Sequence, residues 1–422
     1  MPVQIDIPGA DTQGRVFLTW TPVQATARLV GGTAAGPVNV TLSNAGTVGG
    51  VVFDAVRTDQ GASTLQLAVP GDGTPVKFWI AGEFQKPSSA YGDAVVQATD
   101  STGTAVGTKP VMVRIRKNAQ TLPAPERDRF LAALGTLNAQ GQGAYRDFRD
   151  MHVAATSAEM HGNVGFLPWH RTYVLDLERA LQAIDATVAV PYWRFDQGAP
   201  NIFTQDFMGE ADANDRVVFR PGHALEHWVT DGQLGITRGL RFGLNDPANI
   251  NNDEAATLAL GGSGNQYSGF HQMEIDPHGS AHTSFDGPIN FVPTAVRDPL
   301  FFMLHANVDR LWAKWQWAFH RANPTDQAAY ARPSPPRIGH NLGDTMWPWN
   351  LVTTPPRPRT APGGHFPSTV VTPLPGATPK VQDLFDPLGV IAATTLAFAY
   401  DDVPFELPPT VVAGGSVVAG DP

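Results

Sequence analysis

The 422-residue sequence contains no cysteine, and this absence excludes several kinds of chemistry. Without thiols the chain forms no disulfide, no thiolate metal site and no cysteine nucleophile. Charged residues are scarce at 16%, and the formal net charge is −10. We therefore expect no nucleic-acid partner and no basic surface for a membrane. The sequence also lacks an apolar run of about 18 residues, which a membrane-spanning helix would need.

The first residues lack a basic stretch followed by an apolar run, so no signal peptide is predicted. Hydrophobic residues make up 42% of the chain, which is typical of a globular protein with a buried core. We expect a soluble protein of about two or three domains, cytoplasmic or exported with a partner. Composition leaves the oligomeric state open.

Residues 1–118 are predicted to be rich in β-strands. Apolar and polar residues alternate in "VQIDI", "RVFLTW", "VNVTLS", "STLQLAV", "VKFWIAG", "AVVQAT" and "VMVRIRK", and turns with glycine or proline separate these segments. The pattern favours an immunoglobulin-like β-sandwich. None of the 12 histidines of the chain lies here. We expect a domain without catalytic residues, followed by a linker and a helix from about Pro125 to Asn138.

Three histidines stand at nine-residue intervals in the stretch 145–182: His152, His161 and His170. Neighbours on a helix face are three or four residues apart, so these histidines do not share one face. The stretch is instead interpreted as helix, loop and helix, with one histidine on each piece. Pro168 suits the first turn of the last helix. Three imidazoles that converge from separate elements predict a metal site.

A second group of histidines follows later in the chain. His278 and His282 are four residues apart and are expected to share a helix face. Asp276 is a predicted N-cap and Pro277 a predicted first helical residue. His305 lies on a strongly apolar helical stripe, where a lone histidine is more often a packed core residue. Two sets of three histidines nevertheless favour a pair of metal sites.

The residue types indicate which metal these sites hold. No acidic residue lies between His278 and His282, so the H-E-x-x-H pattern of zinc peptidases is absent. Sites built from histidine alone also lack the carboxylates of di-iron helix bundles. Imidazole suits copper, and two facing copper ions can together transfer two electrons to dioxygen. We therefore predict two copper ions per chain.

Two long motifs carry a resemblance to a known family. "GFLPWHRTYVLDLE" and "DPLFFMLHANVDRLWAKWQ" resemble the first-copper and second-copper signatures of the type 3 copper proteins, which are tyrosinases, catechol oxidases and haemocyanins. The resemblance spans residues 145–320 approximately and implies a helical bundle fold. It implies a first copper, copper A, bound by His152, His161 and His170. It implies a second, copper B, bound by His278, His282 and His305.

The resemblance also assigns residues beside the metals. Glu274 is similar to the acidic residue with which many members hold a water near copper B. Asp309 and Arg310 match an Asp-Arg pair of the family, which we interpret as structural.

Three positions depart from the family pattern. Leu304 stands where the family often has an additional histidine. Glu159 stands two residues before His161, where plant and fungal members have a cysteine linked to a copper-A histidine. Gly279 follows His278 where tyrosinases often have asparagine. The last departure predicts that o-diphenols are oxidised well and monophenols slowly or not at all.

The remaining histidines offer a different interpretation of the site. His223 and His227 fit H-x-x-E-H, the inverted zinc peptidase pattern, although a short pattern with two fixed histidines arises easily by chance. His320, His340 and His365 are interpreted as surface or loop residues.

The C-terminal part is rich in proline from residue 331 to 380 and is expected to form an extended covering segment. "TLAFAYDDVPF" predicts a closing strand, and residues 406–422 a frayed tail. The predicted domains are therefore 1–118, 119–405 and 406–422. The sandwich is the candidate shield of the copper site, and Tyr91 in "KPSSAYGD" is a candidate mimic of a phenol there.

These observations predict an α+β multidomain protein, with an N-terminal β-sandwich followed by a mainly helical tyrosinase-like bundle. The predicted activity is that of a polyphenol oxidase, which uses two copper ions and O2 to oxidise phenolic small molecules, o-diphenols above all, to o-quinones. Hydroxylation of monophenols stays open. The alternatives are a haemocyanin-like oxygen carrier and a zinc peptidase that uses His223 and His227.

Overall fold

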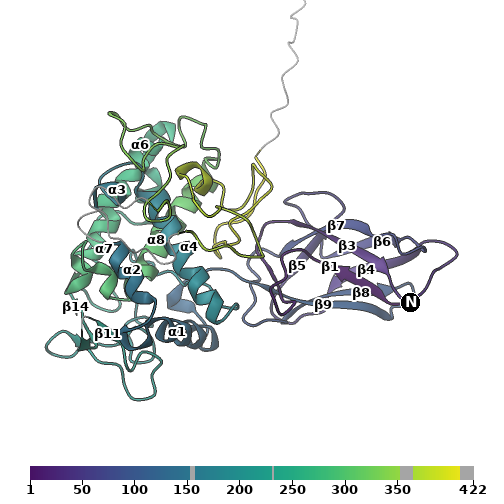
Figure 1. Ribbon diagram of the computed structural model, residues 1–422, viewed down its shortest axis with the longest axis horizontal. Coiled ribbons are helices and arrows are strands. Elements are labelled where there is room, and N and C mark those ends of the chain that lie inside the picture. The colour runs from purple at the N-terminus through teal and green to yellow at the C-terminus, as the bar shows by residue number, and fades with distance from the viewer. Residues whose placement is uncertain (153–156, 231, 352–364, 409–422) are drawn as a thin grey trace, which may run out of the picture.

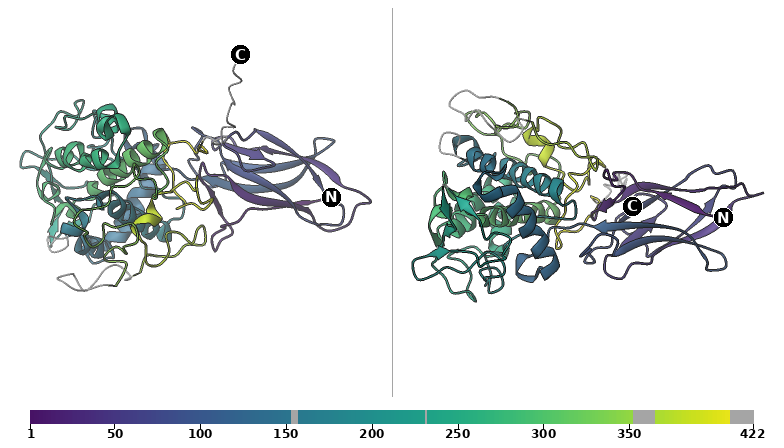
Figure 2. Two further views of the ribbon diagram at one scale, coloured as in Figure 1. Left: turned by 90° about the horizontal axis from the view of Figure 1, so that it is seen from above. Right: turned by 60° about the horizontal axis from the view of Figure 1, so that its bottom comes forward.

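The computed structural model describes residues 1–152, 157–230, 232–351 and 365–408. The longer strands gather in one part of the molecule and the helices, with a few short strands, in the other, and the C-terminal segment runs between the two parts (Figure 1). The same division is visible from two further directions (Figure 2). We call the first part the β region (β1 to β9) and the second the helical region (α1 to α8). No helix in the described ranges is both long and apolar enough to cross a membrane.

The β region contains two sheets, one of four strands and one of five. The strands are β1 (Val3–Asp6), β2 (Val16–Leu18), β3 (Val23–Leu29), β4 (Val38–Asn44), β5 (Val51–Asp54), β6 (Thr64–Val69), β7 (Val76–Gly82), β8 (Ala94–Asp100) and β9 (Ala105–Val113). Each of the seven predicted segments overlaps a strand, although β9 begins six residues before "VMVRIRK" and ends at Val113. The sequence pattern missed β5, which has four residues, and β3, whose inward positions include two alanines that give little hydrophobic contrast.

The two sheets pack face to face around an apolar core. Their strand orders are β1-β3-β7-β5 and β2-β9-β8-β4-β6, and the pairings are antiparallel except between β2 and β9. Ala27 in β3 and Leu42 in β4 are fully buried while their chain neighbours are more exposed, as expected where one face of each strand meets the core. This arrangement is a sandwich of two sheets.

Two long helices form the centre of the helical region. They are α4 (Phe166–Ile184) and α8 (Leu300–Ala318), and they pack against each other. The other helices are α1 (Ala124–Asn138), α2 (Tyr145–Met151), α3 (Ser157–Met160), α5 (Glu254–Leu258), α6 (Tyr267–Phe270) and α7 (Ser280–His282). Helix α4 begins two residues before Pro168, which lies in its first turn. Both long helices bury most of their residues, so they form the core against which the shorter elements pack.

Three short antiparallel strand pairs lie in the described part of the chain between α4 and α8. They are formed by β10 (Arg216–Val217), β11 (Val229–Thr230), β12 (Gln233–Leu234), β13 (Ile236–Thr237), β14 (Gly239–Leu240) and β15 (Phe285–Asp286). Most of the described residues between 186 and 253 are loop.

A buried ionic network joins the β region to α4 and α8. The Arg116 guanidinium, just after β9, donates to Glu178 Oε2 of α4 at 2.8 Å and to Asp309 Oδ2 of α8 at 2.9 Å. Asp309 also accepts from the Tyr400 hydroxyl at 2.7 Å and pairs with Arg171. Since Arg116 is fully buried, its charge is compensated by groups of the protein and not by water. This geometry supports the structural role predicted for Asp309.

The β region contacts the end of α4 that lies away from the histidines. The Arg114 guanidinium donates to the carbonyl of Ala186, beyond the last turn of α4, whereas His170 is in its second turn. At about 1.5 Å per residue, these positions are roughly 20 Å apart. The Tyr91 hydroxyl instead donates to Pro110 O of its own sheet at 2.9 Å. The predicted shielding of the histidines by the sandwich, with Tyr91 as a phenol mimic, is therefore wrong.

The closing strand predicted at "TLAFAYDDVPF" is also wrong. This segment forms only an isolated bridge, in which Arg116 N donates to Ala399 O at 2.9 Å and Asp401 N donates to Arg116 O at 3.1 Å. The chain passes between two regions there, so it has no strand neighbour to extend a ladder. The predicted tail beyond residue 408 and the proline-rich stretch 352–364 lie outside the described residues.

Candidate metal centre

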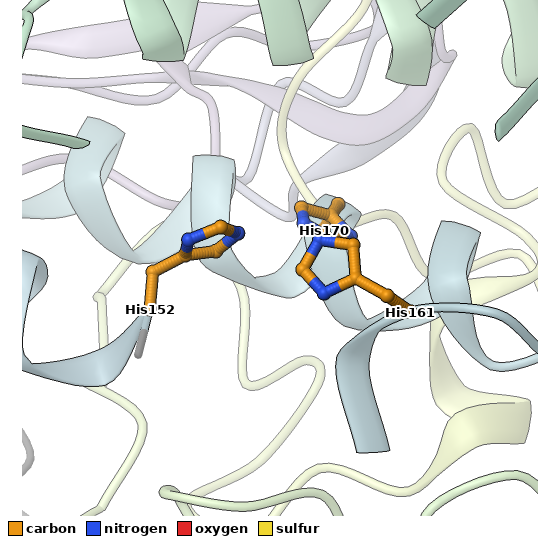
Figure 3. A group of neighbouring side chains, drawn as sticks. All are labelled: His152, His161 and His170. Atoms are coloured by element: carbon orange, nitrogen blue, oxygen red, sulfur yellow. The ribbon is translucent and has the colours of Figure 1, made fainter. Parts of the chain in front are cut away.

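Three separate elements bring the first histidine group together, as predicted. His152 ends α2, His161 lies in the turn between α3 and α4, and His170 is in α4. Their rings point toward one another (Figure 3), with ring centroids 4.9 to 5.7 Å apart. One nitrogen of each ring lies within 4.8 Å of the others. This spacing suits three ligands around one metal ion.

Backbone carbonyls orient two of these rings. His152 Nδ1 is 2.8 Å from Val292 O, and His170 Nδ1 is 2.9 Å from Phe166 O. A carbonyl only accepts, so each Nδ1 carries the proton and each Nε2 keeps a lone pair. Both Nε2 atoms are buried and have no hydrogen-bond partner among the described residues. Buried lone pairs that face one another are the donor set that a metal would satisfy.

The second histidine group also forms as predicted. The Nε2 atoms of His278 and His282 lie 3.3 and 3.2 Å from His305 Nε2. Carbonyls again fix the rings, since His278 Nδ1 is 2.7 Å from Glu274 O and His282 Nδ1 is 2.7 Å from Ile289 O. All three ligand atoms converge within 4.8 Å.

The backbone around His278 differs from the predicted simple helix. Asp276 is extended, with φ −144° and ψ 121°, and lies in an irregular π-like turn, Ile275–Gly279, before α7. Its carboxylate accepts from Asn251 N, from Asn252 N and from the Ser280 hydroxyl. It therefore ties two loops together and does not cap the first helical amides as predicted. Pairing to loop amides more than 20 residues away has no local sequence signal.

The two histidine groups face each other across a ring stack. The rings of His170 and His305 are 4.4 Å apart and nearly parallel, at 14°. Phe166 contacts rings of both groups, at 4.4 Å from His170 and 4.8 Å from His278. Phe301 stacks on His305 at 4.1 Å. Sequence reasoning did not single out these two phenylalanines, since nothing local distinguishes them from other core aromatics.

Burial keeps the histidines neutral. Desolvation, and then the mutual repulsion of the imidazolium forms, hold the pKa values of His152, His170, His278 and His305 well below the usual range. Burial lowers the pKa of His282 to about 4. Neutral imidazole is the form that binds metal, so the donor set is available at neutral pH.

Glu274 contacts both histidine groups and stands four residues before His278 in the sequence. Its Oε1 accepts a hydrogen bond of 2.6 Å from Gly162 N, next to His161. Burial raises its pKa to about 7. A Cβ added at Gly279 would come no closer than 3.4 Å to the carbonyl of Glu274, so a side chain fits there.

Other histidines take no part in these groups. His223 and His227 belong to no metal-binding group within the described ranges, and Leu225 N donates to His223 Nδ1 at 3.0 Å. This geometry does not support the zinc peptidase alternative. His340 corrects a prediction, because it is fully buried and its Nδ1 accepts from Gly165 N at 2.8 Å. Its isolated place in a proline-rich segment gave no sign of this role at the start of α4.

Two facing three-histidine sites define a binuclear metal protein, and comparisons with known proteins identify its family. Residues 142–318 match the model of the common central domain of tyrosinase. The chain is 30% identical over 279 residues to the tyrosinase of Streptomyces glaucescens, covering 56% of this chain and 92% of that one. It is 30% identical over 267 residues to the tyrosinase of Streptomyces antibioticus, covering 57% and 94%.

A haemocyanin is also among the proteins that the chain resembles. Hemocyanin 2 of Megathura crenulata is 31% identical over 223 residues, which cover 48% of this chain and 6% of that protein. The chain belongs to the tyrosinase family. Proteins of this family carry a binuclear copper site, the tyrosinases among them are copper oxidoreductases, and the two histidine groups suit that pair of ions.

Proposed function

We propose that this protein is a polyphenol oxidase that oxidises o-diphenols to o-quinones with O2. The observation that carries the proposal is the convergence of six imidazole rings in two facing groups. In this proposal His152, His161 and His170 hold copper A, and His278, His282 and His305 hold copper B. The copper pair supplies the exchange of two electrons with dioxygen that neither site would perform alone.

The exposure of the six histidines indicates from which side a substrate would approach. His161 and His282 are partly exposed, whereas the other four rings are buried, so each group has one side toward solvent. Phe166 and Phe301 are fully buried and pack against the rings from the interior. A phenol would therefore approach from the side of His161 and His282.

Glu274 is proposed to assist as an acceptor near copper B. One of its oxygens is bonded to Gly162 N, which leaves the other for a water. A monophenol needs deprotonation, and a positioned base promotes this step. Gly279 offers no side chain to hold that water, so the preference for o-diphenols is retained.

The same proposal covers the division of the chain. Residues 1–118 form an immunoglobulin-like sandwich domain, residues 119–405 the di-copper domain and residues 406–422 a tail. The two-sheet topology and the absence of histidine from residues 1–118 support this division.

A haemocyanin-like oxygen carrier is the second candidate, favoured by the match to Hemocyanin 2. The two functions differ in what happens to an added phenol. A carrier binds O2 reversibly at the copper pair and leaves catechol unoxidised.

The test is to mix copper-loaded protein with catechol and oxygen, and to follow quinone absorbance and oxygen consumption together. A polyphenol oxidase forms two quinones for each O2 that is reduced to water. His305→Ala, which removes one imidazole of the second group, should show no quinone formation above free copper. Oxygen binding without quinone formation would establish the carrier instead.

A further inference from the structure

The segment that carries His161 lies in a turn, not in a long helix. His170 and His305 are fixed by the interiors of α4 and α8, whereas His161 follows the four-residue α3. The chain has no cysteine that could link this segment covalently to a ring, and Glu159 takes that place in the sequence. Whatever holds His161 in place must therefore be non-covalent.

On one side, the segment is tied to the loop that follows residue 338. Glu159 is buried, and its Oε1 accepts a hydrogen bond of 3.0 Å from Trp347 N. Gly339 packs against the same side chain so closely that a Cβ there would lie 2.6 Å from Glu159 Cγ. Gly339 also has φ +78°, where glycine is favoured. The loop is thus shaped around this glutamate.

On the other side, the segment is tied to the second histidine group. Glu274 Oε1 accepts from Gly162 N at 2.6 Å, while Glu274 O accepts from His278 Nδ1 at 2.7 Å. One residue therefore fixes a ring of the second group with its backbone and the His161 segment with its side chain.

We propose that Glu159 and Glu274 are positioning residues that hold the His161 segment from two sides and so set the metal affinity of the first histidine group. Carboxylate bonds to backbone amides are stronger than neutral ones, and two of them flank His161 within two residues. This inference rests on the proposed role of His161 as a ligand. Removal of outer groups that orient a ligand typically lowers metal affinity about 10- to 100-fold.

The test measures copper affinity and needs no turnover. Copper(I) is titrated in competition with a chelator into His305→Ala protein, in which the first group alone keeps three histidines. Adding Glu159→Ala or Glu274→Ala should weaken binding about 10- to 100-fold. Adding Glu159→Gln or Glu274→Gln should restore most of the affinity, since the amide oxygen still accepts from Trp347 N or Gly162 N.

Two controls separate positioning from other effects. Glu226→Ala removes a similar bond, from Gly222 N to Glu226 Oε2 at 2.7 Å, outside the histidine groups, and should leave copper affinity unchanged. In a His170→Ala background, where the second group alone is complete, Glu159→Ala should also have no effect. Circular dichroism checks that each variant is folded.

Unchanged affinity in both folded alanine variants would overturn the inference, and so would glutamine variants that bind as weakly as the alanine ones. If an alanine variant unfolds, its glutamine counterpart decides, since loss of affinity there excludes a positioning role. Failure of the proposed function would look different. The parent His305→Ala protein would bind no copper at the first group if these histidines were not ligands, and copper-loaded wild-type protein would leave catechol unoxidised if the chain were a carrier.

Discussion

The β region and the helical region solve the problem of burying polar groups in opposite ways. Within residues 1–118, all of which are described, the buried charged side chains are Arg114 and Arg116, and both face the helical region. The helical region buries four histidines, together with acidic and basic residues in its two long helices. Buried polar groups are costly unless paired. The many buried polar groups of the helical region therefore mark the functional part of the molecule, and their burial lowers the stability of that part.

The largest expected effect concerns Arg116, whose ion pairs join the β region to the helical region. Arg116→Ala would leave Glu178 and Asp309 buried without their shared cation, which costs about 3–5 kcal/mol of unfolding free energy. Denaturant unfolding followed by tryptophan fluorescence measures this loss. Arg28→Ala is the control, because its pair with Asp6 is exposed, at 3.8 Å, and contributes at most about 1 kcal/mol. Equal losses in both variants would show that the buried network does not join the regions.

The two regions should also differ in how their stability depends on pH, because the helical region contains a buried carboxylate. Asp176 of α4 accepts a hydrogen bond of 2.7 Å from Trp349 Nε1, and burial raises its pKa to about 7. Between about pH 4 and 7 the folded protein keeps a proton that the unfolded chain releases, so stability falls as the pH rises. The slope is at most about 1.4 kcal/mol per pH unit.

Asp176→Asn should remove this part of the slope, because an amide does not titrate and still accepts from Trp349. The check is the melting temperature of both proteins at several pH values from 4 to 8. The residues 1–118 contain no buried carboxylate, so the β region should contribute little to the difference. Identical pH slopes in the two proteins would contradict the assignment to Asp176.

The smallest expected effect concerns which phenols are accepted. Gly279→Asn should fit without backbone movement and raise the ratio of monophenol to diphenol rate about three- to tenfold, by helping Glu274 hold a water. Glu274→Gln should lower that ratio. Initial rates with a matched monophenol and diphenol measure it. Wild-type protein that oxidises both equally fast would show that Gly279 is no barrier.

Sequence alone predicted the β region well because its signal is local. Alternation of apolar and polar residues follows from the geometry of one strand, and only the short β5 and the alanine-rich β3 escaped. The histidine groups were predicted because spacing and motif mark each member. Their pairing in space agrees with the prediction.

The remainder depends on contacts between distant segments. The buried His340 bonds to Gly165 N over 175 positions, and Glu159 bonds to Trp347 N over 188. The carbonyl of Val292 orients the ring of His152 over 140 positions. The carbonyl of Ile289 orients the ring of His282 from seven residues away, and neither carbonyl carries a side-chain signature. The position of the β region at the far end of α4 also follows from tertiary packing, so the shielding hypothesis failed.

The most direct test of the central claim is a count of copper per chain, by metal analysis after copper loading and removal of loosely bound ions. Wild-type protein should hold two coppers, and His170→Ala and His305→Ala should each hold one, since each substitution disrupts one group of three imidazoles. Zinc in place of copper, a single copper in wild-type protein, or two coppers retained in either variant would contradict the assignment of the two histidine groups.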